Sequence, residues 1–303
     1  MADRVEPKPA QLPLPGGQEG AVVRLHPLLC GEATWPDAWP HRRGGPLTKL
    51  RALGFRESRN DWVPIPLVAF LVEHPGFGPF LIDTGLDPSV AEDPRENLGR
   101  LVSATGAKTV EMKPEQAVPA QLRERRVDPN DVGLVVMTHL HYDHASGVSQ
   151  FPRATFLVTG REWEAAHGRA AVTKGYRAGH VDHPFNWHAI DFDERGVSSF
   201  STFGRAFDLF GDGSVHLLST PGHTRGHMSV LLHTGAGDVL AVGDAAYTRR
   251  TLRTGHLPAF MDDEHLFRRS LREIQLFSEQ RPDAVLIPGH DMGAWRTLEP
   301  VYG

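Results

Sequence analysis

The chain has 303 residues, of which 40% are hydrophobic and 23% are charged, and both fractions are ordinary for a globular protein. A net charge of -5 argues against nucleic-acid binding, because such proteins present a basic face to the phosphates. No apolar stretch reaches the roughly 18 residues that a membrane-spanning helix requires, so we expect no membrane partner.

The N-terminal part of the chain begins with a polar segment and continues with strand-like runs. Residues 1–20 are rich in proline and glycine and lack the apolar core of a secretory signal, which predicts a flexible leader. Residues 21–29 are expected to form a first strand, and residues 32–46 a loop with two tryptophans. Strands at 64–72 and 80–82 are expected to form a hairpin around two glycines.

Helices and strands alternate in the rest of the chain. Residues 118–127 and 161–166 are expected to be helical, and in residues 267–278 apolar side chains recur on one helical face. Residues 168–193 lose this periodicity and are expected to form an irregular insert, a candidate lid. Further strands are expected at residues 133–137, 156–158, 206–210, 215–218, 229–232, 239–242 and 284–287. This order predicts two sheets packed face to face and covered by helices, in a single domain from residue 21 to 303.

Seven side chains that suit a divalent metal ion follow the predicted strands in four short segments. They are His139, His141, Asp143, His144, His223, Asp244 and His290. Imidazole and carboxylate groups bind zinc and other borderline divalent ions. A lone HxH motif means little in a chain with 17 histidines, but the complete set at strand ends is hard to obtain by chance. Because one tetrahedral ion cannot use seven ligands, the set predicts two metal ions.

The spacing of these residues indicates how two ions would be held. His139 and His141 point to the same side of an extended segment, about 7 Å apart at the backbone, and can bind one ion. Asp143 and His144 can reach a second ion, and Asp244 can bridge both because a carboxylate has two oxygens. Two ions about 3.5 to 4 Å apart can share a hydroxide, and their net positive charge would stabilise an oxyanion. With nitrogen and oxygen ligands only, zinc is expected, and cobalt, manganese or iron is compatible.

Several other residues have two open interpretations. Asp83, which follows a predicted strand, could form a plain turn or support a metal ligand. His227 is expected to be structural, and His180 and His183 are expected to be solvated or packing residues. Tryptophans and histidines outside the metal motif could fill the core or line a substrate pocket. The candidate pocket residues are Trp35, Trp39 and His188.

The metal motif resembles that of the metallo-β-lactamase fold hydrolases and, among them, the quorum-quenching N-acyl homoserine lactone lactonases. It reads His139-x-His141-x-Asp143-His144, followed by His223, Asp244 and His290. The lactonases place a tyrosine three residues after the bridging aspartate, where it touches the substrate carbonyl, and Tyr247 stands at this position. The resemblance runs from about residue 21 to the C-terminus. It implies an αβ/βα four-layer sandwich and opening of the lactone ring of N-acyl homoserine lactones by a bridging hydroxide.

The resemblance also implies a role for each residue of the motif. It assigns His139, His141 and His223 to one metal, assigns Asp143, His144 and His290 to the other, and makes Asp244 the bridge. Asp143 and Tyr247 are the implied catalytic residues, and Asp143 would pass a proton to the leaving alkoxide. The leader, the tryptophan loop and the insert look longer than in the compact lactonases, so the acyl-chain preference stays open.

Other functions remain as alternatives. A glyoxalase II-like thioesterase uses the same seven ligands, but it needs a cationic glutathione site and no tyrosine at position 247. Hydrolysis of another lactone or ester, or a metal-binding sensor without activity, is also open. A β-lactamase with a cysteine ligand is disfavoured because the only cysteine, Cys30, is far from the motifs. A flavo-di-iron protein is disfavoured because His141 stands where that group has an acidic ligand, and a nuclease would need a more basic chain.

Composition gives weaker expectations about the surroundings of the protein. The single cysteine excludes an internal disulfide and fits a reducing compartment, so a cytoplasmic location is expected. The expected partner is a small-molecule lactone. The oligomeric state stays open, with a homodimer among the options.

Overall fold

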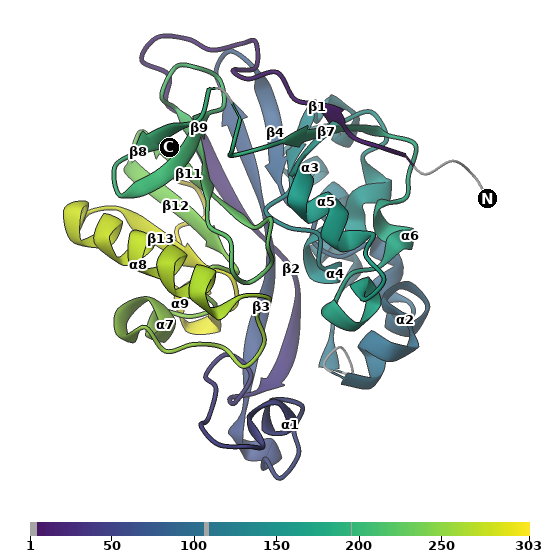
Figure 1. The fold of residues 1–303 in the computed structure, drawn as a ribbon. Coiled ribbons are helices and arrows are strands. Elements are labelled where there is room, and N and C mark those ends of the chain that lie inside the picture. Colours follow the sequence, from purple (N-terminus) through teal and green to yellow (C-terminus); the bar gives the residue numbers. More distant parts are fainter. Residues whose placement is uncertain (1–4, 106–108, 195) are drawn as a thin grey trace.

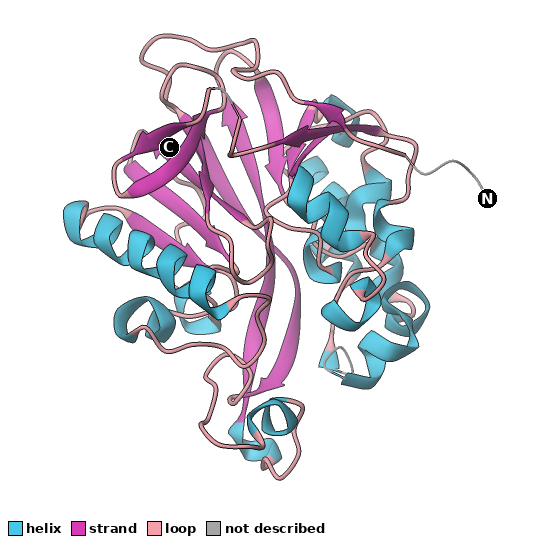
Figure 2. Cartoon of the chain, in the orientation of Figure 1, coloured by secondary structure: helices cyan, strands magenta, loops and turns pink. Residues whose placement is uncertain are grey.

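Two β-sheets pack face to face, and helices cover the outer face of each sheet (Figure 1, Figure 2). The structure is a computed structural model and describes residues 5–105, 109–194 and 196–303. The arrangement confirms the predicted α/β sandwich of two mixed sheets between helical layers.

The strands divide by position in the chain, with the N-terminal strands in one sheet and the C-terminal strands in the other. The seven-stranded sheet contains, in spatial order, β1 (Lys8–Pro9), β7 (Asn186–Ile190), β6 (Thr155–Thr159), β5 (Leu134–Val136), β4 (Gly78–Ile82), β3 (Trp62–His74) and β2 (Arg24–Pro36). The six-stranded sheet contains β13 (Val285–Pro288), β12 (Gly237–Gly243), β11 (Met228–Thr234), β10 (Val215–Ser219), β9 (Phe203–Asp208) and β8 (Ser198–Phe200). Strands β4, β5, β6 and β7 are parallel to one another, which leaves their carboxyl ends at one edge.

The helices lie in two groups outside the sheets (Figure 1). Beside the seven-stranded sheet lie α2 (Pro94–Thr105), α3 (Val118–Glu124), α4 (Tyr142–Ala145), α5 (Gly160–Ala166) and α6 (Ala178–Val181). Beside the six-stranded sheet lie α7 (Arg249–Thr254), α8 (Glu264–Gln280) and α9 (Met292–Trp295), and α1 (Thr48–Ala52) projects beyond the ends of β2 and β3. Within the described part of the chain, no helix has the length and apolarity to cross a membrane.

Short 3-10 helices complete the connections. They are Arg59–Asp61, Pro88–Ala91, Pro114–Gln116, Pro129–Asp131, Ser146–Gln150 and Ala171–Lys174. Proline opens three of them at the first helical position, where its missing N–H would have had no partner.

Strand β5 illustrates how the apolar pattern positions the loop that follows it. Leu134 and Val136 belong to the core between the two sheets, whereas Val135 packs under the helices on the opposite face. A strand buried on both faces reads as a continuous apolar run, as the sequence did at residues 133–137. The run ends at the carboxyl edge of the parallel strands, so the polar residues 138–144 emerge there.

The core between the sheets is apolar and joins the two halves of the chain. Phe70 and Val136 enter it from the seven-stranded sheet, and Leu217 and Val230 enter it from the six-stranded sheet. Neither sheet could bury its inner face alone, so the two sheets share this core. The boundaries of a single domain over residues 21–303 stay a prediction.

The first long strand extends further than predicted. β2 runs to Pro36, with Trp35 paired to Val63 of β3, so the expected loop at residues 32–46 begins only after this strand. Gly31, at a β-bulge and with φ +144°, allows the strand to bend without ending. The prolines and glycines of this segment therefore mark a bent strand followed by a loop.

The prediction of a flexible leader is wrong for the described residues 5–20. β1 pairs with β7, and the N–H of Leu14 donates to the carbonyl oxygen of Leu209 at 2.7 Å. Leu12 and Leu14 pack against the core between the sheets. A two-residue strand has no sequence pattern of its own, because its partner strand supplies the pairing.

The expected insert at residues 168–193 is also only partly irregular. It contains α6 and the strand β7, whose Trp187 is fully buried beneath the helical layer. The segment around Gly175 is irregular and lies beside His141. Its action as a lid stays a prediction.

Candidate metal centre

Loops from both sheets meet at one edge of the sandwich and bring the seven predicted ligands together. The loop between β5 and α4, together with the first turn of α4, carries four of them. The loops after β10, β12 and β13 carry one each. The four are His139, His141, Asp143 and His144, and the three are His223, Asp244 and His290. All are buried except His141, which is partly buried.

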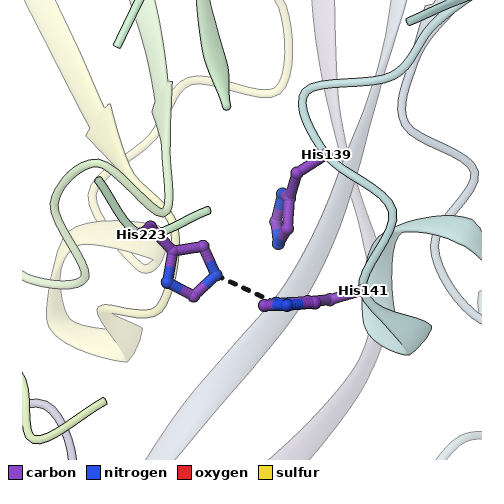
Figure 3. Close-up of side chains that lie close together, drawn as sticks. All are labelled: His139, His141 and His223. Carbon is purple, nitrogen blue, oxygen red and sulfur yellow. Dashed lines mark hydrogen bonds between the residues drawn. The ribbon is translucent and has the colours of Figure 1, made fainter. Parts of the chain in front are cut away.

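One group of ligand atoms contains three histidine nitrogens. His139, His141 and His223 each offer a nitrogen within 4.8 Å of the others, and their rings point toward one another (Figure 3). Nε2 of His223 lies 3.0 Å from Nδ1 of His141 (Figure 3). Three nitrogens around one point are suited to a tetrahedral ion that keeps a position open for substrate.

A second group lies beside the first and contains a carboxylate. Asp143, His144 and His290 offer atoms within 4.8 Å of one another. Oδ2 of Asp143 lies 3.5 Å from Nε2 of His290 and 3.8 Å from Nε2 of His144.

Asp244 lies between the two groups, with contacts to both. Its Oδ2 is 3.2 Å from Nε2 of His223 and 3.8 Å from Nε2 of His139. Its Oδ1 is 3.5 Å from Nε2 of His144 and 3.2 Å from Nε2 of His290, which also lies 3.3 Å from Oδ2. Oδ2 thus faces His139 and His223 of the first group, Oδ1 faces His144 of the second, and His290 lies near both oxygens, which is an arrangement suited to a bridge between two ions.

The hydrogen bonds of these side chains show that the residues fit metal ions. Nε2 of His139, Nε2 of His144 and Oδ1 of Asp244 are buried and have no hydrogen-bond partner. A buried polar atom without a partner is costly, and coordination to an ion would satisfy all three. The opposite nitrogens are anchored: Nδ1 of His144 donates to Oδ2 of Asp83 at 2.8 Å, and Nδ1 of His290 donates to the carbonyl oxygen of Pro66 at 3.0 Å. These anchors leave the Nε2 lone pairs free to bind an ion.

Asp83 supports the centre from the end of β4. Its carboxylate accepts hydrogen bonds from His144, from the Thr138 N–H at 2.8 Å and from the Thr138 hydroxyl at 2.7 Å. The backbone of Asp83 has φ +60°, an unusual conformation for a residue with a side chain. The surrounding hydrogen bonds hold it there, so Asp83 orients His144 and does not itself join either ligand group.

His227 positions the bridging aspartate through the backbone. Its Nε2 accepts the N–H of Asp244 at 3.0 Å, while its Nδ1 contacts the Thr220 hydroxyl at 2.9 Å. Gly243, with φ +58°, allows this approach, because a Cβ there would lie 2.8 Å from Nε2 of His227. His227 thus has a structural role, as expected, and this role is to position the backbone of Asp244.

Burial keeps three of the histidines neutral. It lowers the pKa of His141 to about 3, and it holds the pKa values of His139 and His223 well below their ordinary range. A neutral imidazole has a lone pair to offer, and a protonated one has none.

The carboxylates and histidines of the second group influence one another. Burial alone would raise the pKa of Asp244, but the neighbouring histidines, His290 above all, outweigh it and hold that pKa well below its ordinary value. Burial alone would lower the pKa of His144, but the carboxylates of Asp83 and Asp143 outweigh it and raise that pKa. The bridging carboxylate therefore stays ionised at neutral pH.

A cavity of about 510 Å³ opens onto the ligands. Its floor includes His141, Asp143, His223 and Asp244, and both apolar and polar side chains line the rest, the polar ones being Lys49, Thr173, Lys174 and Asp262. The apolar and aromatic lining residues are Trp35, Trp39, Leu53, Tyr142, Val172, Tyr247, Phe260 and Met261.

The two tryptophans proposed from sequence lie in this wall. Trp35 packs with its ring centroid 4.9 Å from Trp39 and 5.0 Å from the ring of His290, and Trp39 packs 4.7 Å from Phe260. Trp35 is buried and also belongs to a hydrophobic cluster, so it both fills the core and lines the cavity. The sequence left open whether Trp35 fills the core or lines a pocket, and in the structure it does both.

Tyr247 lies at the floor of the cavity, buried beside the first group. Its hydroxyl is 3.2 Å from Nδ1 of His223, and its ring centroid is 5.2 Å from that of His290. The tight turn after Asp244, through two alanines, returns the phenol over the ligands.

His188 does not line this cavity, so its interpretation as a pocket residue was wrong. It lies on β7, paired with Lys8 of β1, and its Nε2 is 3.2 Å from Oδ1 of Asn186. The insert that carries His188 forms a regular strand here, which takes the side chain away from the metal edge. His180 and His183 also lie outside the cavity lining, as the packing interpretation expected.

The sequence pattern did not mark one wall of the cavity. Phe260, Met261 and Asp262 lie in the loop between α7 and α8, and Lys174 pairs with Asp262 at 2.7 Å. These residues follow no motif and no periodic run. Only their position next to Gly222 and His223, whose carbonyl oxygens accept the N–H of Asp262, brings them to the site.

Comparison with known proteins agrees with this geometry. Residues 63–290 match the family model described as the metallo-beta-lactamase superfamily, and the chain belongs to this superfamily. Within it, the chain is related to the N-acyl homoserine lactonases. It is 33% identical to N-acyl homoserine lactonase AttM of Rhizobium radiobacter over 239 residues, which are 78% of this chain and 85% of the relative. It is 28% identical to N-acyl homoserine lactonase AiiA of Bacillus thuringiensis subsp. kurstaki over 230 residues, 75% of this chain and 82% of the relative.

Solved structures share the fold. An N-acyl homoserine lactone hydrolase with N-hexanoyl-L-homoserine bound at its catalytic metal centre superposes with a TM-score of 0.72 at 22% identity, covering 92% of this chain and 97% of the other. A point mutant of B. thuringiensis AiiA with N-decanoyl-L-homoserine bound at its active site gives the same TM-score, identity and coverage.

Proposed function

We propose that this chain is a two-metal hydrolase that opens the lactone ring of N-acyl homoserine lactones. The observation that carries the proposal is the Asp244 carboxylate, which faces both ligand groups at the floor of a cavity that also presents Tyr247. The relatives named as N-acyl homoserine lactonases support the choice of substrate.

The seven side chains would hold two divalent ions, with zinc as the expected metal and cobalt, manganese or iron compatible with the same ligands. His139, His141 and His223 would hold one, Asp143, His144 and His290 the other, and Asp244 would bridge them. When bound, such a pair of ions would polarise the carbonyl of an ester and make water a nucleophile near neutral pH.

Tyr247 would act on the carbonyl oxygen through its hydroxyl. If Nε2 of His223 binds an ion, the proton of the neutral imidazole is on Nδ1, and Nδ1–H donates to the Tyr247 oxygen. The phenolic proton is then free to donate into the cavity. A lactone carbonyl placed there gains a hydrogen bond as its oxygen becomes negative during attack.

Asp143 would hold and transfer a proton. It lines the cavity, and its Oδ2 faces His144 and His290, so the carboxylate lies between the ligand group and the bound substrate. In ring opening, the ester C–O bond breaks and the leaving oxygen becomes an alcohol, which requires one proton. Asp143 is the carboxylate placed to accept the proton that the nucleophile releases when the new C–O bond forms, and then to pass it to the leaving oxygen.

Part of the cavity wall suits an acyl chain. Trp39, Phe260 and Met261 offer apolar surface near the ligands. Two lysines, Lys49 and Lys174, also line the cavity, and Lys174 pairs with Asp262 at 2.7 Å. The choice of the lactonase over the glyoxalase II-like thioesterase therefore rests on Tyr247 and on the relatives named as lactonases.

The proposal is tested by hydrolysis rates of the metal-loaded protein on a series of N-acyl homoserine lactones of increasing acyl length, with a glutathione thioester as the competing substrate. We expect lactone turnover to exceed thioester turnover, because the cavity offers Tyr247 to a lactone carbonyl and apolar side chains to an acyl chain. Faster thioester hydrolysis, or turnover of neither substrate, would refute it.

A further inference from the structure

A buried glutamate lies beneath the first ligand group and is not one of its ligands. Glu162, in the first turn of α5, has no solvent-exposed surface. Its Oε1 accepts the backbone N–H of Leu140 at 3.0 Å, and its Oε2 accepts the hydroxyl of Thr224 at 2.6 Å. Leu140 lies between His139 and His141 in the chain, and Thr224 directly follows His223.

These two hydrogen bonds join loops that belong to different sheets. The loop with Leu140 follows β5 of the seven-stranded sheet, and the loop with Thr224 connects β10 and β11 of the six-stranded sheet. In Figure 3, His139 and His141 approach from one side and His223 from the other. The Glu162 carboxylate therefore spans the junction across which the three imidazoles must converge.

The backbone around this junction is packed closely. The hydroxyl of Thr159, the N-cap residue of α5, donates to the carbonyl oxygen of Gly226 at 2.8 Å. A Cβ at Gly226 would lie 2.3 Å from the backbone nitrogen of Glu162, so only glycine permits this contact. The start of α5 thus packs directly against the loop that carries His223.

The second ligand group has other supports. His144 is held by Asp83, and His290 is held by the carbonyl oxygen of Pro66. Neither Asp83 nor Pro66 contacts the loop that carries His223 through a described hydrogen bond. A change at Glu162 should therefore act on one ligand group and spare the other.

We propose that Glu162 is a positioning residue that holds His139, His141 and His223 in register across the two sheets and so sets the affinity of that group for its ion. The inference rests on the proposed two-metal function and deepens it. Burial of a carboxylate raises its pKa, which the hydrogen bonds from Thr224 and Leu140 oppose. Such a buried carboxylate is costly unless hydrogen-bonded, so both of its contacts are needed.

The test is a Co²⁺ titration of the full-length metal-free chain, followed by visible absorption and competition with a chelator. Glu162→Ala should weaken one of two cobalt equivalents by about 10- to 100-fold, the usual range for a support behind a metal ligand, and leave the other unchanged. Glu162→Gln keeps an oxygen that can accept the Leu140 N–H and should restore part of the lost affinity. Glu164→Ala, exposed two residues further along α5, is the matched control and should change neither equivalent.

Three outcomes would overturn the inference. Both equivalents could bind as tightly in Glu162→Ala as in the parent, or both could weaken equally, which would indicate general loosening of the fold. A parent that binds less than two equivalents would contradict the proposed function itself and the inference with it. If Glu162→Ala does not fold, Thr224→Val is the deciding variant. It removes the hydrogen bond from the Thr224 hydroxyl to Glu162 at nearly constant side-chain volume, and it should weaken binding of the same single cobalt equivalent to a smaller extent.

Discussion

At the scale of single residues, two aspartates near the centre differ in what their carboxylates touch. Asp244 faces the free nitrogens of both ligand groups, whereas Asp83 contacts Thr138 and the far nitrogen of His144. One carboxylate can bind ions, and the other can only orient a ligand. Their removal should therefore have unequal consequences.

We expect Asp244→Ala to lose more activity and more metal than Asp83→Ala. Loss of the bridge removes a ligand from both ions, while loss of an orienting partner typically costs about 10- to 100-fold. Lactone turnover and metal content measured on both variants check this. Equal losses of activity and metal would contradict the bridging role of Asp244 and the orienting role of Asp83.

Tyr247→Phe should lower kcat for lactones while metal content and folding stay intact. An oxyanion donor contributes about 10²- to 10³-fold, and because an ion shares the carbonyl oxygen here, we expect the lower end or less. Tyr302→Phe is a matched control, since Tyr302 is also buried but lies at the C-terminal end of the core. Parent-like turnover in Tyr247→Phe would remove the role proposed for the phenol.

At the scale of elements, α8 depends on its N-cap. The Asp263 carboxylate accepts the N–H groups of His265 at 2.9 Å and Leu266 at 3.0 Å, and the helix buries Phe267, Leu271, Ile274 and Phe277 against the six-stranded sheet. The predicted helical face is thereby confirmed, and the cap explains where the helix begins.

Asp263→Ala should lower the free energy of unfolding by about 1 kcal/mol, because two N–H groups lose their acceptor. Urea denaturation at fixed metal concentration measures this difference. Asp283→Ala serves as the control, since Asp283 is exposed and should shift stability by less than about 0.5 kcal/mol. A cap effect no larger than that of the control would contradict the assignment.

Helix α6 carries a histidine that should make the fold sensitive to acid. Burial lowers the pKa of His180 to about 4, Nε2 contacts the Asn97 carbonyl oxygen at 3.1 Å, and Nδ1 is buried without a partner. The unfolded chain gains a proton near pH 6.5 and the folded chain does not until about pH 4, so stability falls as pH decreases across this window.

His180→Gln removes this titration. The loss of unfolding free energy between pH 7 and pH 4.5, measured by urea denaturation, should be smaller in the variant than in the parent. His265→Gln, at an exposed position of α8, is the control for loss of a histidine at the surface. An unchanged slope in His180→Gln would show that other groups govern the acid response.

At the scale of the whole molecule, the ligands couple the two sheets. The first ligand group takes two histidines from the seven-stranded sheet and one from the six-stranded sheet, and Asp244 contacts both sides. Ions bound there would cross-link the halves of the sandwich and stabilise only the folded state.

Removal of metal by a chelator should therefore lower Tm, and re-addition of zinc should restore it in proportion to occupancy. Calorimetry of the parent with and without metal measures the shift. Asp244→Ala should show a smaller shift than the parent, because each ion loses one ligand and binds more weakly. A Tm that does not respond to metal would contradict the cross-link.

The sequence by itself determined the seven candidate ligands, the strand that precedes each of their segments and the superfamily. Those features depend on local patterns: β5 is an apolar run because both of its faces are buried, and each ligand follows a strand that the chain must leave. The spacing of the HxHxDH segment is fixed by consecutive residues, so it could be read without knowing where the other loops lie.

Only the tertiary structure decided the rest, because the deciding contacts join residues far apart in the chain. Pairing of β1 with β7 gives the N-terminal segment a defined conformation, and His188 lies on β7 outside the cavity lining. Phe260 lines the cavity from a loop that carries no sequence motif. The role of Glu162 could not be predicted from the sequence for the same reason, because its hydrogen-bond partners lie 22 and 62 positions away in the chain. A single sequence gives the residue types and the local periodicity of apolar side chains. The long-range contacts depend on the packing free energy of the complete two-sheet fold, which no local pattern contains.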